Sequence, residues 1–134
     1  MPRALTIDGY RIADDSDCYV IAEIGHNHQG DVEKCMELFR TAAECGANAV
    51  KLQNRHNRSL FTRTMFNEHY GSENAFAPTY GEHREYLELE YSEYLELCAY
   101  AKELGITFFA TAFDFKSADF LEKLDMPAYK IASG

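Results

Sequence analysis

The sequence feature that most constrains the fold is a repeated unit of a helical segment, a short turn and an apolar strand. The segments TAAECGANAVKLQ, YAKELGITFFATAF and FLEKLDMPAYKIAS align with one another, and each passes through Gly or Asp into a strand. Gly46 and Gly105 stand where the residue after a helix commonly adopts a positive φ. The repeat predicts alternating helices and strands, which is the pattern of βαβ units.

Four near-continuous apolar runs are expected to form strands, at residues 19–25, 48–53, 106–113 and 128–134. Such runs are typical of parallel strands that helices cover. No Gly-rich phosphate fingerprint follows any of these strands, which argues against a Rossmann fold. We therefore expect an α/β fold in which residues 1–134 form the N-terminal half of a (β/α)₈ TIM barrel, with about four parallel strands, covering helices and no second domain.

Helices are expected from about Asp31 to Cys45, from near Ser92 and from near Ser117, each beginning at a residue that commonly caps a helix. Residues 54–91 interrupt the repeat and are far longer than a usual βα loop. Long excursions after a strand are often lids or substrate loops, although a decorative insertion is the alternative. A short helix is expected within this excursion, at about residues 60–68.

Composition narrows the class of protein. Of the 134 residues, 46% are hydrophobic and 26% are charged, which is ordinary for a soluble globular domain. A formal net charge of −9 argues against a nucleic-acid surface but leaves room for a small anionic substrate in a locally positive pocket. No apolar run is long enough to span a membrane, and the first residues lack the apolar core of a signal peptide. We therefore expect small-molecule partners, no nucleic acid, no membrane and a cytoplasmic location.

Polar residues end each of the four predicted strands. In (β/α)₈ enzymes the active site is built at the carboxyl ends of the strands. Four strands that all supply polar groups at one end therefore indicate a site more strongly than any single motif. These residues are Glu23, Asn27 and His28 after the first strand, Lys51, Gln53 and Arg55 after the second, Thr111 and Asp114 after the third, and Lys130 and Ser133 after the fourth.

Two of these residues, Lys51 and Lys130, carry a positive charge within apolar strands. An ammonium group covered by helices is costly unless an opposite charge meets it. The partner could be a phosphate or carboxylate ligand, or it could be Glu23, and a lysine could also extend its ammonium to the surface. Because two lysines stand at equivalent places in successive units, the pattern favours an anion-binding site.

Glu23 lies in an apolar strand, so its carboxylate should be paired, or protonated with a raised pKa. It could orient a sugar hydroxyl or act as a general acid or base, and the alternative is that it only balances Lys51. His26 and His28 stand two residues apart and should point in opposite directions, so no metal site is expected from them. His28 is expected at the mouth of the site.

Three further histidines lie in the long excursion, and all three are expected to face solvent. They are His56, His69 and His83.

Four short motifs make the chain resemble the N-acetylneuraminate (sialic acid) synthase family. They are IAEIGHNHQG at 21–30, KLQ at 51–53, TAFD at 111–114 and KIASG at 130–134, and YGEHRE at 80–85 also resembles that family. The resemblance runs from Tyr19 onward, and it implies a TIM-barrel enzyme that condenses phosphoenolpyruvate with an open-chain amino sugar such as N-acetylmannosamine. The products would be a nonulosonic (sialic) acid and phosphate.

The resemblance also implies roles for individual residues. Lys51, Thr111, Lys130 and Ser133 would hold the phosphate and carboxylate of phosphoenolpyruvate, whereas Glu23 and Gln53 would face the amino sugar. Asn27 and His28 are further candidates for substrate binding.

The resemblance further implies a divalent metal, Mn²⁺ or Mg²⁺, whose histidine ligands come from later strands and not from this chain. It implies a homodimer in the full-length form, in which an antifreeze-like domain of the partner subunit closes the site. This portion alone is therefore expected to be inactive. Two residues depart from the family pattern: His26 replaces a residue that is usually small and apolar, and Ala132 stands where glycine is common.

Three alternatives stay open at this point. The sugar could instead be the precursor of legionaminic, pseudaminic or a spore-coat sugar acid. The chain could be a non-catalytic half-barrel that self-associates as a binding or structural module. It could also belong to another phosphoenolpyruvate-using barrel, such as the deoxy-octulosonate phosphate synthases, although the motif IAEIGHNHQG argues against that reading.

Overall fold

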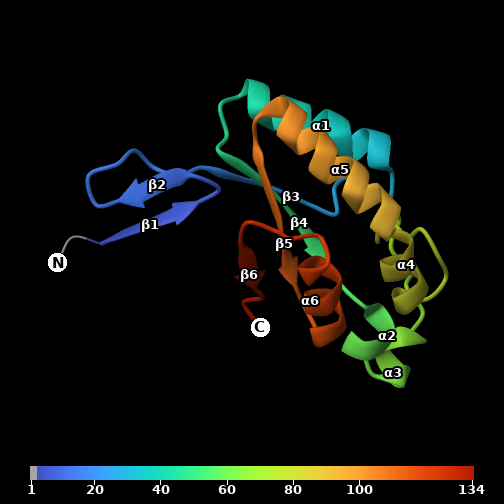
Figure 1. The fold of residues 1–134 in the computed structure, drawn as a ribbon. Helices are drawn as coiled ribbons and strands as arrows, with labels where there is room; N and C mark the ends of the chain where they lie inside the picture. Colours follow the sequence, from blue (N-terminus) through green and yellow to red (C-terminus); the bar gives the residue numbers. More distant parts are fainter. Residues whose placement is uncertain (1–2) are drawn as a thin grey trace.

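A computed structural model describes residues 3–134, so Met1 and Pro2 of the predicted unit lie outside the described residues. Its main sheet has four strands in the order β3-β4-β5-β6, and each strand pairs in parallel with the next one along the chain. A helix follows each of the first three strands, so the predicted half of a (β/α)₈ barrel is confirmed (Figure 1). The elements are β3 (Ile21–Gly25), α1 (Val32–Glu44), β4 (Ala49–Asn54), α5 (Tyr91–Leu104), β5 (Thr107–Ala112), α6 (Phe115–Glu122) and β6 (Tyr129–Ile131).

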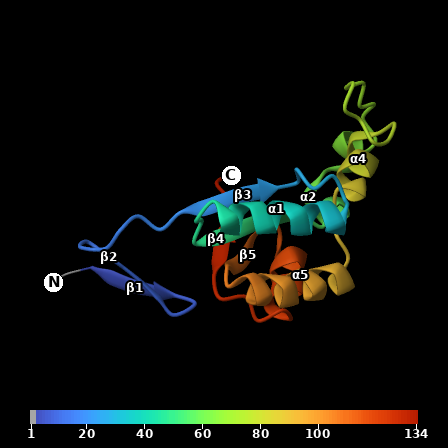
Figure 2. The ribbon, with the colours of Figure 1, turned by 90° about the horizontal axis from the view of Figure 1, so that it is seen from above.

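The core lies between the sheet and two helices, α1 and α5, which run side by side along one face of it (Figures 1 and 2). Phe39 of α1 meets Phe108 of β5 edge-on with ring centroids 5.0 Å apart, and Tyr94 of α5 lies 5.9 Å from the same ring. Val50 and Leu52 of β4 are also fully buried in this cluster. Each such side chain contributes roughly 1.5–3 kcal/mol when it leaves water. Because strand side chains alternate between faces, residues between these core positions point to the other side of the sheet.

Each of the three long helices begins directly after an acidic residue that caps it. Asp31 caps α1 as predicted, since its carboxylate accepts from the backbone N–H of Lys34 at 3.1 Å. The predicted starts near Ser92 and Ser117 are confirmed to within two residues, since α5 begins at Tyr91 and α6 at Phe115, but neither serine is the cap because both already lie in the first turn. The residue before the first turn acts as the cap in each case, Glu90 for α5 and Asp114 for α6.

A β-hairpin precedes the barrel strands and was not predicted. It consists of β1 (Ala4–Ile7) and β2 (Tyr10–Ala13), joined through Asp8 and Gly9, which have φ values of 49° and 79°. Two successive positive φ angles are typical of a type I′ turn, for which Asp-Gly is a strong signal in the sequence. The hairpin projects away from the barrel strands (Figures 1 and 2), and the Thr107 hydroxyl donates to the Asp8 carboxylate at 3.0 Å.

The long excursion contains three short helices, α2 (Asn57–Leu60), α3 (Arg63–Phe66) and α4 (Tyr80–Tyr86). The short helix expected at about residues 60–68 is present as α3, which is shorter than that range, whereas α2 and α4 were not predicted. The helical conformation is interrupted between α2 and α3 because Thr62 caps a new helix. Its hydroxyl accepts from the backbone N–H of Met65 at 3.2 Å. These helices gather beyond the carboxyl end of β4 (Figure 1), which is the end where a barrel site is expected.

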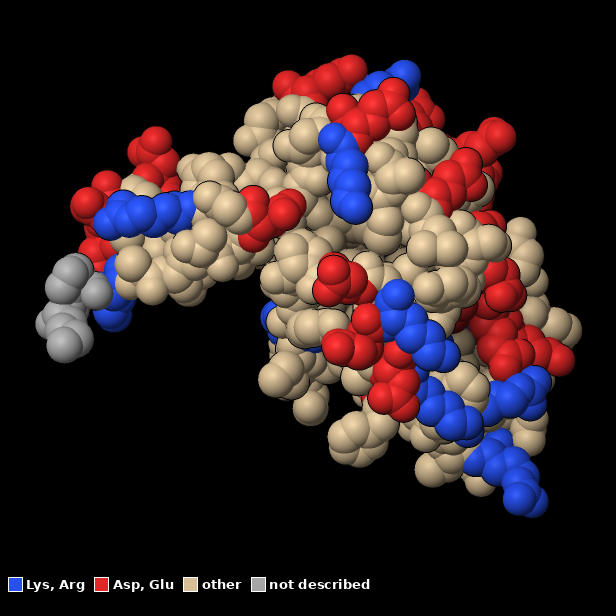
Figure 3. Space-filling model, viewed as in Figure 1, with Lys and Arg blue, Asp and Glu red and all other residues tan. Residues whose placement is uncertain are grey.

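Charge is unevenly distributed on the surface. On the face shown in Figure 3, acidic side chains are spread over most elements, whereas many basic ones gather over the region of α2, α3 and α6. This region borders the end of the sheet toward which β4 and β5 point (Figure 1). Within residues 3–134, no helix is both long and apolar enough to cross a membrane.

We predict that Gly30→Ala destabilises the protein more than Gly46→Ala does. Both glycines have a positive φ, 76° and 83°, so both substitutions incur the left-handed penalty of about 1–2 kcal/mol. A Cβ on Gly30 would lie only 2.3 Å from the carbonyl oxygen of Tyr86 at the end of α4, whereas a Cβ on Gly46 would meet nothing within 4 Å. Gly30→Ala should therefore lose about 1–3 kcal/mol more in free energy of unfolding, measured by urea denaturation. Equal losses would show that α4 does not rest on Gly30.

Candidate active site at the carboxyl ends of the strands

The strand register places five of the predicted site residues on one face of the sheet, opposite α1 and α5. Glu23 pairs with Lys51 across β3 and β4, and Gln53 pairs with Thr111 across β4 and β5. Lys130 of β6 pairs with Thr111. Paired residues of neighbouring parallel strands point to the same side. In a closed barrel this side is the interior.

Lys51 is the centre of this polar face. Its ammonium lies 2.5 Å from Glu23 Oε2 and donates to Thr111 Oγ1 at 2.6 Å, while its side chain is only 11% exposed. The charge is thus paired within the protein, which is the lysine–glutamate alternative considered from the sequence. An ammonium group has three N–H donors, so one donor remains beyond these two contacts. The arrangement can therefore still bind an anion.

Gln53 connects the Lys51–Glu23 pair to Arg55, which lies just beyond the end of β4. Its Nε2 donates to Glu23 Oε1 at 3.1 Å, so both carboxylate oxygens of Glu23 act as acceptors. Gly25 lies beside this contact, and a Cβ there would be slightly too close to Glu23 Oε1 at 3.3 Å and in ordinary contact with Gln53 Nε2 at 3.5 Å. The glycine of the IAEIG motif is favoured mainly by its positive φ of 59°.

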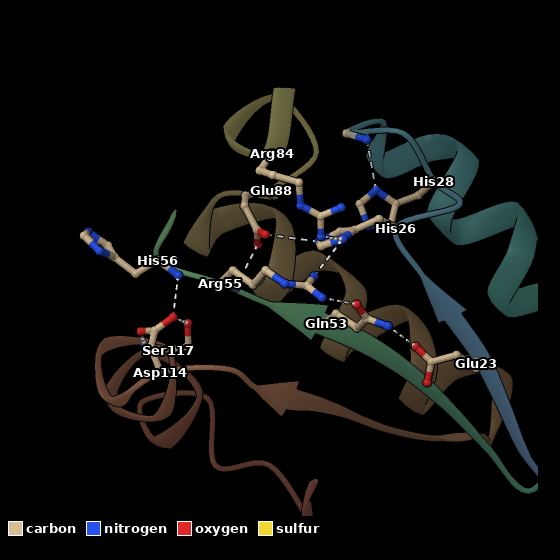
Figure 4. Close-up of polar contacts among 11 residues, drawn as sticks. Glu23, His26, His28, Gln53, Arg55, His56, Arg84, Glu88, Asp114 and Ser117 are labelled. Atoms are coloured by element: carbon tan, nitrogen blue, oxygen red, sulfur yellow. Dashed lines mark hydrogen bonds and ion pairs between the residues drawn. The ribbon is translucent and has the colours of Figure 1, made fainter. Parts of the chain in front are cut away.

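Arg55 extends the network beyond the end of β4. Its Nη2 donates to Gln53 Oε1 at 2.7 Å (Figure 4). Its guanidinium also lies 3.7 Å from the centroid of the Phe113 ring. Burial, and then the positive charge of Arg84, lower the pKa of the Arg55 guanidinium. Arg84 comes from α4, so the long excursion contributes directly to this site.

His26 lies between the two arginines. Its Nδ1 is 3.1 Å from Arg55 Nη1 and 3.3 Å from Arg84 Nη2. A guanidinium can only donate, so His26 Nδ1 must accept and the ring proton must be on Nε2. This nitrogen lies 3.1 Å from Glu88 Oε1, while Glu88 Oε2 accepts from the backbone N–H of Arg55 at 3.2 Å (Figure 4).

The sequence prediction missed three members of this network. His26 was considered only as a possible metal ligand with His28 and as a departure from the family pattern, and neither Arg84 nor Glu88 was singled out. Arg84 and Glu88 are separated from His26 by about 60 residues, and only the path of the excursion brings them together. The motif YGEHRE, which contains Arg84, was the one available signal.

His28 does not lie at the mouth of the site, and that prediction is wrong. The side chain is 1% exposed, and its Nδ1 accepts from the backbone N–H of Gly30 at 3.0 Å. Its ring meets that of His26 edge-on with centroids 5.6 Å apart, so the two histidines do not point in opposite directions. The chain turns at this point and does not continue as a strand, so the alternation assumed from the sequence does not apply. His83, expected at the surface, is also buried, next to Tyr70 and Phe76.

The remaining predicted residues are separate from the Lys51 network. Lys130 is exposed on the edge strand β6, where its Nζ donates to the carbonyl of Ile131 at 2.5 Å, and Ser133 is exposed beyond the same strand. Asn27 closes its own turn by donating to the carbonyl of Ile24 at 2.8 Å. Lys130 and Ser133 are exposed because β6 has a strand neighbour on one side only.

Asp114, the last predicted residue, has a structural role. Its Oδ1 accepts from the backbone N–H of Ser117 at 2.8 Å, and its Oδ2 accepts from the Ser117 hydroxyl at 2.9 Å and the backbone N–H of His56 at 2.8 Å (Figure 4). Asp114 thus caps α6 and, through the backbone N–H of His56, holds the start of the long excursion against that helix.

The described residues do not fit the metal that the resemblance implies. No group of three or more His, Cys, Asp or Glu side chains within residues 3–134 could hold a metal ion. The Nδ1 atoms of His26 and His28 already accept from N–H donors, so neither lone pair faces an open position. The expectation that the ligands come from outside this chain stays a prediction.

The buried state of His28 predicts a pH dependence of stability. Burial, and then the neighbouring His26, lower the pKa of His28 from 6.5 to about 4. Between these values the unfolded chain binds a proton that the folded chain does not, so stability is lost as the pH falls from about 6.5 to about 4.

We expect that loss to be about 3 kcal/mol, and His28→Asn, which keeps an acceptor but does not titrate, should remove most of it. Urea unfolding at pH 7 and pH 4 measures the difference, with His69→Asn as the exposed control. The same pH dependence in His28→Asn as in the unaltered protein would contradict the assignment.

Several known proteins are similar to this chain in sequence and in fold. The NeuB family model matches residues 38–134. The N-acetylneuraminate-9-phosphate synthases of Mus musculus and Drosophila melanogaster are 42% and 45% identical over 87% of this chain, and the N,N'-diacetyllegionaminic acid synthase of Legionella pneumophila is 40% identical over 87%. The chain spans about a third of their length, 33%, 31% and 33% respectively.

Two solved structures support the same relationship. A sialic acid synthetase from Leptospira borgpetersenii superposes with a TM-score of 0.78 at 28% identity, covering 99% of this chain and 42% of that one. The spore coat polysaccharide biosynthesis protein SpsE of Bacillus subtilis superposes with a TM-score of 0.71 at 29% identity, covering 98% and 34%. With a family match over most of its length and a shared barrel fold, the chain belongs to the NeuB family.

Proposed function

We propose that the protein carrying this chain condenses phosphoenolpyruvate with an open-chain amino sugar to give a nonulosonic acid and phosphate. The observation that carries the proposal is Lys51, a largely buried ammonium at the carboxyl ends of parallel strands, beside the Thr111 hydroxyl and with a donor to spare. Burying such a charge is costly, and a purely structural half-barrel would gain nothing from it. Self-association as a non-catalytic module therefore stays the weaker alternative.

The proposed reaction forms one carbon–carbon bond and one carbon–oxygen bond to water, and it breaks the carbon–oxygen bond to the phosphate. The methylene carbon of phosphoenolpyruvate attacks the aldehyde carbon of the sugar, which leaves positive charge on the carbon that bears the phosphate. Water adds to that carbon, and the bond to the phosphate oxygen breaks to give the 2-keto acid. Of the two protons of the water, one ends on the former aldehyde oxygen and the other on the departing phosphate.

The residues of this chain would bind and orient the reactants. Lys51 and Thr111 would donate to the phosphate or carboxylate of phosphoenolpyruvate and stabilise the negative charge on the leaving group. Lys130 and Ser133 would complete this anion site, as the family resemblance implies. Glu23 and Gln53 would face the sugar, with Glu23 placed to accept a proton or a hydroxyl hydrogen bond.

Several further features are part of the proposal through the family resemblance alone. A divalent metal, Mn²⁺ or Mg²⁺, would be held by residues outside this chain, because the described residues offer no suitable ligand group. The full-length protein would be a homodimer and would act in the cytoplasm. The relatives' names include synthases of sialic acid phosphates and of diacetyllegionaminic acid, so the sugar could carry a phosphate or a second acetamido group.

A phosphate-release assay tests the proposed function. The full-length protein would be incubated with phosphoenolpyruvate, Mn²⁺ and one sugar at a time: N-acetylmannosamine, its 6-phosphate, or a 2,4-diacetamido sugar. We expect phosphate release only when a sugar is present, together with a product whose mass equals sugar plus pyruvate. Release that needs no sugar, or no release with any of them, would refute the proposal.

Replacing Lys51 tests the anion site itself. We expect Lys51→Ala in the full-length protein to abolish turnover and to weaken phosphoenolpyruvate binding by about 10- to 100-fold, because a charge-assisted hydrogen bond is lost and Glu23 is left to repel the anion. Calorimetric titration measures the affinity. Lys102→Ala, which removes the same charge from an exposed position on α5, serves as the control. Near-normal kinetics in Lys51→Ala would remove Lys51 from the site.

A further inference from the structure

We propose that Arg55 is a positioning residue that fixes the amide of Gln53 and so determines how the site recognises the amino sugar. The identity of the ligand rests on the proposed function, whereas the positioning of Gln53 does not. Arg55 acts through Gln53 and is not expected to touch the reacting atoms.

The two contacts of Gln53 allow its amide only one orientation. The carbonyl oxygen accepts from Arg55 Nη2 at 2.7 Å, and the amide nitrogen donates to Glu23 Oε1 at 3.1 Å. A flipped amide would set its NH₂ group against the guanidinium and its oxygen against the carboxylate. Donor would face donor and acceptor would face acceptor, so both contacts would become repulsive.

This orientation has a consequence for recognition. The amide nitrogen carries two N–H donors, of which Glu23 engages one. One N–H donor of Gln53 is therefore left for a ligand, while Arg55 engages one of the two lone pairs on its oxygen. Because the amide is fixed in one orientation, its free N–H favours a ligand group that accepts at that point, such as a sugar hydroxyl or an N-acyl carbonyl.

Arg55 is itself held from several sides. Its guanidinium lies over the Phe113 ring at 3.7 Å and donates to His26 Nδ1 at 3.1 Å, and its backbone N–H donates to Glu88 Oε2 at 3.2 Å. Phe113 follows β5, His26 lies in the turn after β3, and Glu88 lies in the segment after α4. A planar guanidinium with donors in fixed directions suits such a position better than the single ammonium of lysine.

The contacts form an unbroken polar chain from the excursion to the anion site. It runs from Glu88 and His26 through Arg55 to Gln53, then to Glu23 and Lys51. The excursion at residues 54–91 is therefore more than a decorative insertion, because it supplies the groups that orient the first members of the site.

Kinetics on the full-length protein test the recognition part. Arg55→Met keeps an unbranched stem and removes every donor, so we expect the KM for the amino sugar to rise by about 10-fold or more, in line with the loss of a charge-assisted contact. The KM for phosphoenolpyruvate should change by less than about twofold, because Lys51 keeps its partners. Arg55→Lys, which keeps the charge, should restore part of the sugar KM. Arg58→Met is the matched control, since this exposed arginine of the same excursion pairs with Glu85.

A spectroscopic measurement tests the positioning part without reference to activity. With glutamine side chains labelled with ¹⁵N, the amide signals of Gln53, identified by their loss in Gln53→Leu, should shift in Arg55→Met and stay in place in Arg58→Met. Unchanged Gln53 signals in Arg55→Met would overturn the proposal whatever the kinetics show.

The possible outcomes separate the two proposals. A shift of the Gln53 signals with an unchanged sugar KM would overturn the recognition role. If the unaltered protein condenses no sugar at all, the proposed function fails, and the Gln53 signals alone decide whether Arg55 positions that amide. If Arg55→Met does not fold, Arg55→Lys decides instead, with a smaller shift expected and no shift counting against the proposal.

Discussion

The structure of this site depends on one constraint: the ammonium of Lys51 cannot stay unpaired within a strand that is covered by its neighbours. Glu23 and Thr111 meet this requirement, and they come from the strands on either side of β4. The sequential order of the sheet is what makes these three residues neighbours, because each strand pairs with the next one along the chain. A charged residue that would destabilise an ordinary sheet thus becomes the centre of the polar face.

The two faces of the sheet differ in character, one being apolar and covered by helices and the other polar. One face carries Val50, Leu52 and Phe108 against α1 and α5, and its burial stabilises the fold. The other carries the alternate residues, among them Glu23, Lys51 and Gln53. Because a strand has a period of two, the same short segment AVKLQ supplies both. This explains how a nearly apolar run in the sequence can include functional residues without weakening the core.

The long excursion, residues 54–91, brings side chains from its far end back to the carboxyl end of β4. Its helices are short, and α4 packs closely on the turn after β3, where the carbonyl of Tyr86 lies over Gly30. That packing brings Arg84 and Glu88 to His26 and Arg55, and through Arg55 to Gln53. Two guanidinium groups face Nδ1 of His26, so this ring nitrogen acts as the acceptor in both contacts.

The sequence by itself determined the four parallel strands, the helices between them and the polar residues at the strand ends, because periodicity and turn residues are local properties of the chain. It also indicated the family through its motifs. Only the tertiary structure decided that His28 is buried and that His26, Arg84 and Glu88 meet one another and Arg55. These outcomes depend on which segments pack against one another across tens of residues, and a local pattern does not encode such contacts.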